Sequence, residues 1–192
     1  MSIEYRRQFE GAVLLDVARA EIAESLGLEF ELTPAQAEPW LTAQGATFVT
    51  LTKYGELRGC IGTLEAYRPL IEDVRQNARA AAFRDPRFSP VREEEFTMVS
   101  LEVSLLSIPE PMAVETEAEA MARLRPHIDG VVLEYGRHRS TFLPQVWEQL
   151  PDPYQFLMHL KRKAGLAADF WADGLRLSRY GVQKWKEADV PR

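Results

Sequence analysis

Residues 46–62 decide the fold of this chain, and they read ATFVTLTKYGELRGCIG. The first half of this stretch, 46–53, is rich in β-branched and aromatic residues, which is typical of a strand. Tyr54-Gly55-Glu56 can turn the chain, so that residues 57–61 return beside the first strand. The stretch therefore predicts a β-hairpin whose second strand carries the hexapeptide Leu57-Arg58-Gly59-Cys60-Ile61-Gly62.

Further strands are predicted downstream of the hairpin. At 98–106 apolar residues alternate with polar ones, which favours an antiparallel strand with one buried face. Shorter strands are expected at 131–135, 140–142 and 175–180.

Helices are predicted where apolar residues recur at three- and four-residue steps, as they do over 3–26 and 69–84. An acidic helix is expected over 115–125. Residues 152–155, DPYQ, have an N-cap residue, a proline and an N3 glutamine, and they begin a helix that ends before Gly165. Residues 33–36, TPAQ, repeat that pattern and predict a short helix.

Strands mixed irregularly with helices predict an α+β fold, in which a mostly antiparallel sheet is flanked by helices. The 192 residues suffice for one domain with a sizeable core, and we expect a single domain over 1–192. The composition, 46% hydrophobic and 27% charged, is that of an ordinary globular protein.

Charge and cysteine content restrict the function classes. The net charge of −6 argues against broad attraction to nucleic acid or to an anionic membrane. A single cysteine excludes an internal disulfide and fits a reducing compartment. No apolar run approaches the ~20 residues that span a bilayer, so we expect a cytoplasmic protein.

The hexapeptide is the first candidate site. Gly59 and Gly62 flank Cys60 within a strand, where glycine marks a bulge or the approach of a ligand to the backbone. In a regular strand Arg58 and Cys60 face the same way, and a guanidinium favours the nucleophilic thiolate. The alternative is that Cys60 is a small core residue and Arg58 a structural ion-pair partner.

A nucleophilic cysteine needs a base, and His127, His138 and His159 are all distant in the sequence. One cysteine and three scattered histidines give no zinc-ligand spacing, so no metal is expected. Gly59-x-x-Gly62 followed by Thr63 is only a weak match to a phosphate-binding loop, because it lacks the lysine.

A second candidate site is Asp85-Pro86-Arg87-Phe88-Ser89-Pro90, directly after the second predicted helix. Its two prolines make a rigid connection that can present Asp85 and Arg87 at fixed positions. The alternative is a structural turn closed by a local Asp–Arg pair.

These residues carry a resemblance. The chain is similar to the AMMECR family, whose bacterial and archaeal members are called AmmeMemoRadiSam system protein A. The matching blocks occur in family order from roughly residue 45 to 180, at 57–62, 85–88, 101–106, 129–131, 142–147 and 163–166.

The resemblance implies an α+β fold with a larger and a smaller subdomain, and a cleft near the hexapeptide. It implies a pathway shared with Memo-like and radical-SAM proteins, and it supplies no reaction, cofactor or substrate. This chain has Asp129 where some relatives place a histidine before the glycine.

Three functional hypotheses follow. The first is a small enzyme with Cys60 as nucleophile or redox thiol, Arg58 favouring the thiolate, and Asp85 and Arg87 lining the cleft. The second is a non-catalytic module that binds a ligand or partner, with Arg58 and Arg87 as anion contacts beside Gly59, Gly62 and Thr63. The third, nucleic-acid binding, is least favoured because the chain is acidic.

Overall fold

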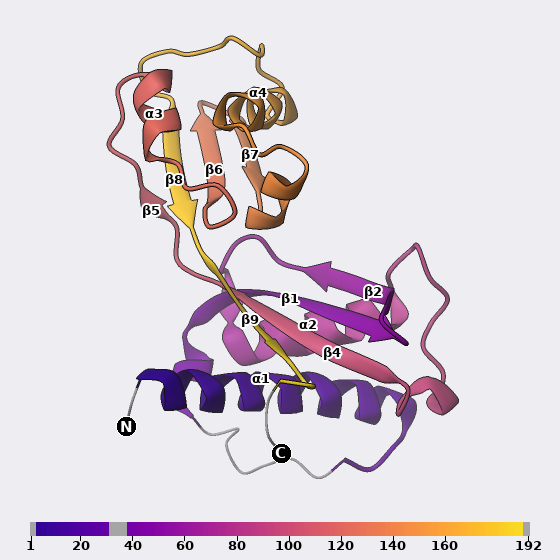
Figure 1. Ribbon diagram of the computed structural model, residues 1–192. Coiled ribbons are helices and arrows are strands. Elements are labelled where there is room, and N and C mark those ends of the chain that lie inside the picture. The colour runs from indigo at the N-terminus through magenta and orange to yellow at the C-terminus, as the bar shows by residue number, and fades with distance from the viewer. Residues whose placement is uncertain (1–2, 31–37, 190–192) are drawn as a thin grey trace. The chain divides into compact units, whose positions relative to one another are not determined.

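A computed structural model of the chain describes residues 3–30 and 38–189. The described residues form two compact units, the first made of those up to residue 106 and from 183 on, and the second of 107–182. Unit 2 is therefore inserted between two stretches of unit 1 (Figure 1). Two hydrogen bonds join the ends of the insert. The Ser107 N–H donates to the Gly181 carbonyl at 2.9 Å, and the Gly181 N–H donates to the Ser107 hydroxyl at 2.9 Å.

Unit 1 is a twisted sheet with two long helices (Figure 1). Its strands run in the order β2-β1-β4-β9, and β1 is antiparallel to β2, β4 and the short β3. In chain order its elements are α1 (Ile3–Leu26), the 3-10 turn η2 (Pro39–Thr42), β1 (Gln44–Lys53), β2 (Glu56–Gly62), β3 (Arg68–Pro69), α2 (Leu70–Phe83), the 3-10 turn η3 (Glu93–Glu95), β4 (Val99–Leu106) and β9 (Val182–Lys186).

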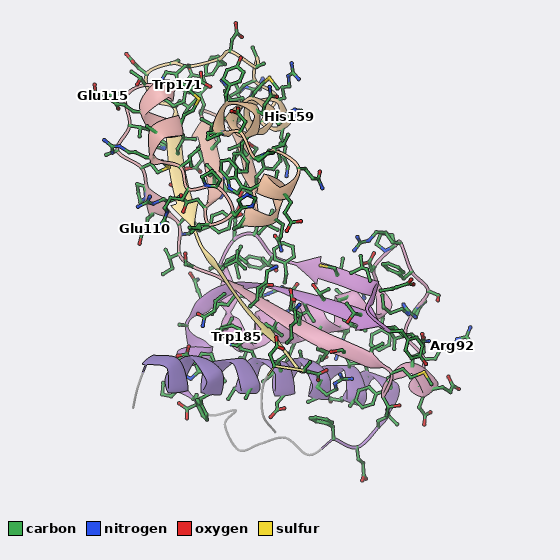
Figure 2. All side chains as sticks on the ribbon, viewed as in Figure 1. Arg92, Glu110, Glu115, His159, Trp171 and Trp185 are labelled. Atoms are coloured by element: carbon green, nitrogen blue, oxygen red, sulfur yellow. The ribbon has the colours of Figure 1, made fainter. Side chains whose placement is uncertain are left out.

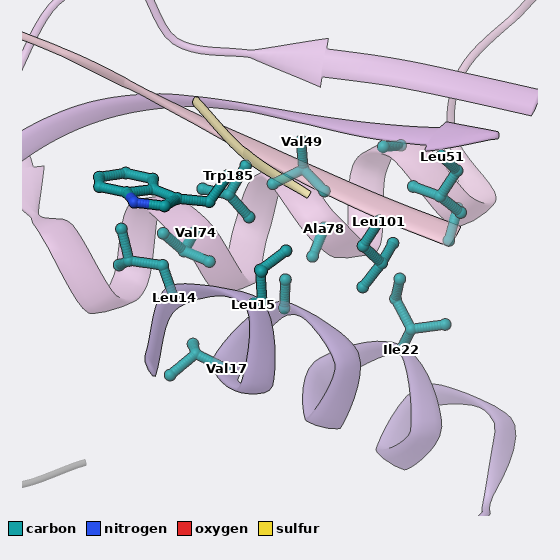
Figure 3. Packing of buried hydrophobic residues seen from close by; sticks show 14 of the residues in the cluster. Leu14, Leu15, Val17, Ile22, Val49, Leu51, Val74, Ala78, Leu101 and Trp185 are labelled. Carbon is teal, nitrogen blue, oxygen red and sulfur yellow. The ribbon is translucent and has the colours of Figure 1, made fainter. Parts of the chain in front are cut away.

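The core of unit 1 lies between one face of the sheet and both helices. Val49, Leu51 and Leu101 point from the strands toward Leu14 and Ile22 of α1 (Figure 3). Each such side chain contributes about 1.5–3 kcal/mol when it is fully buried. The helices thus cover one face of the sheet, and the alternate residues of the strands form its opposite face.

Trp185 extends this core to strand β9 (Figure 3). It packs on α1 at Gly11, where an added Cβ would lie 2.2 Å from the indole ring. The indole ring therefore occupies the space that a side chain at position 11 of the helix would need, and only glycine fits there.

Unit 2 is a smaller antiparallel sheet, β5-β8-β6-β7, packed with two helices. Trp147 stacks on Phe156 in its core, with ring centroids 3.8 Å apart. Trp171 lies beside Glu115 and donates to its backbone carbonyl at 2.9 Å (Figure 2). In chain order the elements are β5 (Glu110–Pro111), α3 (Glu117–Arg123), β6 (Gly130–Tyr135), β7 (His138–Phe142), the 3-10 turn η4 (Pro144–Glu148), α4 (Pro153–Lys163) and β8 (Arg176–Tyr180).

The α+β prediction is confirmed, and so are the predicted hairpin and the four main helices. Asp152 caps α4 by accepting the Gln155 N–H at 2.9 Å, and Gly165 follows its end with φ +79°. The helix predicted at 33–36 lies outside the described residues. In the part of the chain that the structure describes, no helix is long and apolar enough to cross a membrane.

Candidate functional site

Cys60 lies on β2, the edge strand of the unit 1 sheet, directly opposite Thr50 of β1. The Thr50 hydroxyl donates to the Cys60 Sγ at 3.2 Å, and the cysteine is partly exposed. Its neighbours in the strand, Gly59 and Ile61, face α2 and the core. The thiol therefore belongs to the face of the sheet opposite the helices.

A β-bulge interrupts the hairpin just before Cys60. Leu51 pairs with Gly59 but Thr52 pairs with Leu57, so Arg58 is the extra residue on β2. The bulge removes the strict alternation that would place Arg58 and Cys60 on one face of the strand. The parity argument from the sequence therefore does not hold for this pair.

The two glycines of the hexapeptide are required by packing. An added Cβ at Gly59 would lie 2.2 Å from the backbone carbonyl oxygen of Ala81 in α2. One at Gly62 would lie 2.2 Å from the ring of Phe48. Both glycines thus allow close approach of neighbouring protein groups, and neither has a positive φ.

The turn after α2 closes over the open edge of β2 at Cys60. The carboxylate of Asp85 accepts the Cys60 N–H at 2.8 Å, and the Arg87 guanidinium donates to the Cys60 carbonyl at 3.1 Å. The Asp85 and Arg87 side chains are themselves joined at 2.6 and 2.9 Å. This Asp85–Arg87 clamp satisfies both backbone groups of an edge residue, as a further strand would.

Charge within the clamp is strongly stabilised. Hydrogen bonds from the Arg87 side chain hold the pKa of Asp85 far below its usual range; burial opposes this, and the Cys60 N–H adds to it. The pKa of Arg87 is raised, chiefly by its hydrogen bonds to Asp85. The two side chains therefore form a charged pair at the backbone of Cys60.

Arg58 is held by a different group. Its Nε and Nη2 donate to the two carboxylate oxygens of Glu95 at 3.2 and 2.9 Å, and its Nη1 donates to the Ser89 carbonyl at 2.9 Å. Lys53 also donates to Glu95, at 2.9 Å. These hydrogen bonds, that from Arg58 most of all, lower the pKa of Glu95 to about 2. Arg58 thus ties the bulge to the segment after α2.

Thr63 belongs to a polar network at the start of α2. Its hydroxyl accepts from Arg68 at 3.1 Å and from the Asn77 amide at 3.1 Å, and its N–H donates to the Thr47 carbonyl at 2.8 Å. The next helix begins only at Leu70. The Gly59-x-x-Gly62-Thr63 segment therefore does not lead directly into a helix N-terminus.

The face of the sheet that carries Cys60 is polar. Thr50 pairs with Cys60 on one side and with Glu102 of β4 on the other. Glu102 lies 3.8 Å from the Lys184 ammonium and 3.6 Å from that of Lys186 on β9. A row of thiol, hydroxyl, carboxylate and ammonium groups thus crosses all four main strands, where polar or charged ligands can be contacted.

The three histidines and Asp129 all lie in unit 2. His127 has φ +65°, the His138 Nδ1–H donates to the Ala164 carbonyl at 2.9 Å, and His159 lies on α4 (Figure 2). Asp129 is fully buried and accepts from Arg125 at 2.6 Å. Unit 1 therefore contains no histidine that could accompany Cys60 within that unit.

Among the residues that the structure describes, no group of three or more His, Cys, Asp or Glu side chains is arranged to hold a metal ion. The 85–88 turn contacts the hexapeptide at the backbone of Cys60. Their roles in binding a substrate stay predictions.

Two residues that contact the hexapeptide were not predicted from the sequence: Thr50, which donates to the Cys60 sulfur, and Glu95, which binds Arg58. The two-residue turn alone would place Thr50 opposite Gly59, and the bulge at Arg58 shifts its partner to Cys60. Glu95 ends a run of three glutamates, Glu93-Glu94-Glu95, in which nothing local singles it out.

Comparisons with known proteins agree along nearly the whole chain. The family model described as AMMECR1 matches residues 15–185. A protein of Methanothermobacter thermautotrophicus is 39% identical over 181 residues, which cover 93% of this chain and 94% of the relative. Protein MJ0810 of Methanocaldococcus jannaschii is 38% identical over 184 residues, covering 94% and 91%.

A solved structure is similar as well. The crystal structure of uncharacterized protein PH0010 from Pyrococcus horikoshii matches with a TM-score of 0.73 at 34% identity. The match covers 95% of this chain and 93% of that one.

Proposed function

This chain belongs to the AMMECR1 family, and we propose that its working group is the thiol of Cys60, used as a nucleophile or redox thiol by a small enzyme or pathway component. One observation carries the proposal. The thiol of Cys60 is partly exposed and accepts a hydrogen bond from the Thr50 hydroxyl. The Asp85–Arg87 clamp holds the Cys60 backbone at both its N–H and its carbonyl group.

The surroundings of Cys60 favour a reactive thiolate. A hydroxyl that donates to sulfur stabilises the negative charge, because the thiolate is the better acceptor. The thiol is also partly exposed, as reactive cysteines are, whereas inert ones are buried.

The Asp85–Arg87 clamp supports the proposal because it fixes the position of Cys60. Asp85 is 4% exposed, and a buried carboxylate is costly unless hydrogen bonds compensate it. Here it accepts hydrogen bonds from the Cys60 N–H and from the backbone and side chain of Arg87, which itself donates to the Cys60 carbonyl. A functional side chain gains from such a rigid setting, because positioning is part of reactivity.

The direct test is labelling of the native protein with a thiol reagent across a range of pH. Cys60 is the single cysteine, so the signal has one source. We expect labelling without denaturant, at a rate that rises with pH as the thiolate forms. A thiol that reacts only in denaturant would contradict the proposal.

A pair of variants tests the role of Thr50. Thr50→Val removes the hydrogen bond to the sulfur and should slow labelling about fivefold at constant pH, the equivalent of one ordinary hydrogen bond. Thr52→Val is the matched control, because that hydroxyl faces the Ser100 carbonyl instead and its loss should leave the rate unchanged.

A second candidate function is favoured by the absence of histidine from unit 1. Here the chain is a non-catalytic module that presents the Cys60 face to a ligand or to Memo-like and radical-SAM proteins of one pathway. Two measurements on wild type and Cys60→Ser separate the two functions: copurification with such partners, and formation of the pathway product. If Cys60→Ser still binds the partners but the product is lost, the thiol function is supported. If Cys60→Ser changes neither binding nor product, the module is supported.

A further inference from the structure

A hollow of about 540 Å³ lies on the outer surface of α2 in unit 1. Pockets of this volume hold small molecules. None of the groups that contact Cys60 lines it. Its charged lining residues are Arg68, Arg75, Arg79, Arg84, Glu21 and Glu72.

The sign of charge in this hollow is opposite to that of the chain. Four arginines and two glutamates give the lining a formal charge of +2, whereas the whole chain carries −6. Arg75 and Arg79 lie four residues apart on one helix face, where like charges repel. Glu21 pairs with Arg79 and offsets part of this repulsion, which leaves Arg75 as the arginine of the pair without a counter-charge among the described residues.

Arg68, which lines the hollow, is held in place by a buried carboxylate. Its Nε donates at 2.8 Å to Asp73, whose carboxylate is fully buried. Asp73 also accepts from the Thr47 N–H at 2.7 Å and from the Asn77 amide at 2.9 Å. This network fixes the direction of the Arg68 guanidinium before any ligand arrives.

Two arginines of the hollow have donors to spare. Among the residues that the structure describes, the guanidinium groups of Arg75 and Arg84 have no hydrogen-bond or ion-pair partner. Arg79 pairs with Glu21 but keeps half of its side chain exposed. Guanidinium groups bind phosphate oxygens through two parallel hydrogen bonds, a geometry that an ammonium lacks.

Helix electrostatics explain only part of this arrangement. Arg84 is the C-cap of α2, where a cation offsets the negative end of the helix dipole. Arg75 lies near the middle of the helix, beyond the last turn to which that effect extends. A common anionic ligand accounts for both.

We propose that this arginine-lined hollow on α2 binds the oligophosphate group of a small molecule. Arg75 and Arg84 both line the hollow, although they are nine residues apart, about 13 Å along the helix axis and two and a half turns around it. They therefore reach the hollow from its two edges. An extended anion with several phosphate groups engages both, whereas a single orthophosphate ion engages one. Arg79 lies between them in the sequence, and Arg68 lines the hollow from β3, before the helix begins.

Isothermal titration of the full chain with inorganic tripolyphosphate in low salt tests the proposal. We expect saturable one-to-one binding, with orthophosphate binding at least tenfold more weakly. Arg75→Ala combined with Arg84→Ala should weaken tripolyphosphate binding at least tenfold, and the two Arg→Lys changes should have an intermediate effect. Unfolding curves check that each variant is folded.

The matched control removes the same charge elsewhere. Arg137→Ala with Arg162→Ala changes two exposed arginines of unit 2 and should alter the affinity less than twofold. No saturable binding, or an equal loss in this control, overturns the site. Tighter binding of citrate than of tripolyphosphate overturns the phosphate assignment.

Discussion

The carboxylate of Asp85 accepts the backbone N–H of Cys60 at 2.8 Å, so a side chain takes the place of a neighbouring strand at the edge of the sheet. The same carboxylate accepts the backbone N–H of Arg87 at 3.1 Å and the Arg87 guanidinium. One buried acid thus organises both the turn after α2 and the position of Cys60.

Asp85→Ala should therefore lower the free energy of unfolding by about 2–4 kcal/mol, because it leaves a part-buried N–H without its charged acceptor. Asp85→Asn keeps an acceptor and should cost less. Urea unfolding followed by tryptophan fluorescence measures both. Asp152→Ala is the control, since that exposed carboxylate also accepts one backbone N–H and should cost about 1 kcal/mol. A loss at Asp85 no larger than at Asp152 would contradict the clamp.

The glycines of the hexapeptide give a graded prediction. Gly59→Ala should destabilise by about 2–3 kcal/mol, because the opposing atom is a helix carbonyl that cannot move alone. Gly62→Ala should cost about 1–2 kcal/mol, because the added Cβ meets the base of the half-buried Phe48 ring, and the whole ring has to turn away. Gly181→Ala has ordinary space around it and should stay within about 0.5 kcal/mol. Equal effects at all three positions would refute the packing explanation.

Acid should weaken the fold through Glu95. Its pKa is about 2 in the folded chain and near 4.5 when unfolded, so the unfolded state binds more protons between these values. The stability that Glu95 contributes is complete above pH 4.5 and disappears as the pH falls to about 2. One proton gives a slope of at most about 1.4 kcal/mol per pH unit.

Unfolding curves between pH 2 and pH 6 measure this slope. Glu95→Gln should make it shallower, because one titrating group is gone, and Asp85, whose pKa is also lowered, accounts for part of the slope that is left. Glu24→Gln, at an exposed position of α1, should leave it as in wild type. An unchanged slope in Glu95→Gln would show that other carboxyls dominate.

Much of the fold is predictable from the sequence because its long elements carry their own signals. Apolar residues recur with a clear period in α2 and β4, and α4 has both an N-cap and a terminal glycine. Strand β9 was missed, because Trp185 is the one buried residue among its polar neighbours. Its stability comes from pairing with β4 and from the space at Gly11, which are tertiary features.

The sequence indicated some of the residues around Cys60, but neither Thr50 and Glu95 nor the geometry of the contacts. Cys60, Asp85 and Arg87 do meet, yet Asp85 and Arg87 contact the backbone of Cys60. Arg58 binds Glu95 because a bulge, invisible in the residue pattern, redirects it. A one-residue shift in strand register changes every cross-strand neighbour, and local sequence does not report it.

Unit 2 offers a test of charge burial at Lys161 of α4. Its side chain is fully buried and its ammonium lies 2.7 Å from Glu117 of α3, which is 21% exposed. Lys161→Ala should cost about 3–5 kcal/mol, because it opens a cavity where the buried side chain lay. Lys161→Met fills the same space without a charge, and Glu117 can turn to water, so the loss should be below about 1.5 kcal/mol.

Urea unfolding of the two variants decides between packing and charge as the role of Lys161. Lys184→Met, at an exposed lysine, is the control for the change of residue type and should be nearly neutral. Combining Lys161→Met with Glu117→Gln removes both charges and should restore stability to near that of wild type. If Lys161→Met costs as much as Lys161→Ala even in that combination, the ammonium itself stabilises unit 2, and its burial is not merely tolerated.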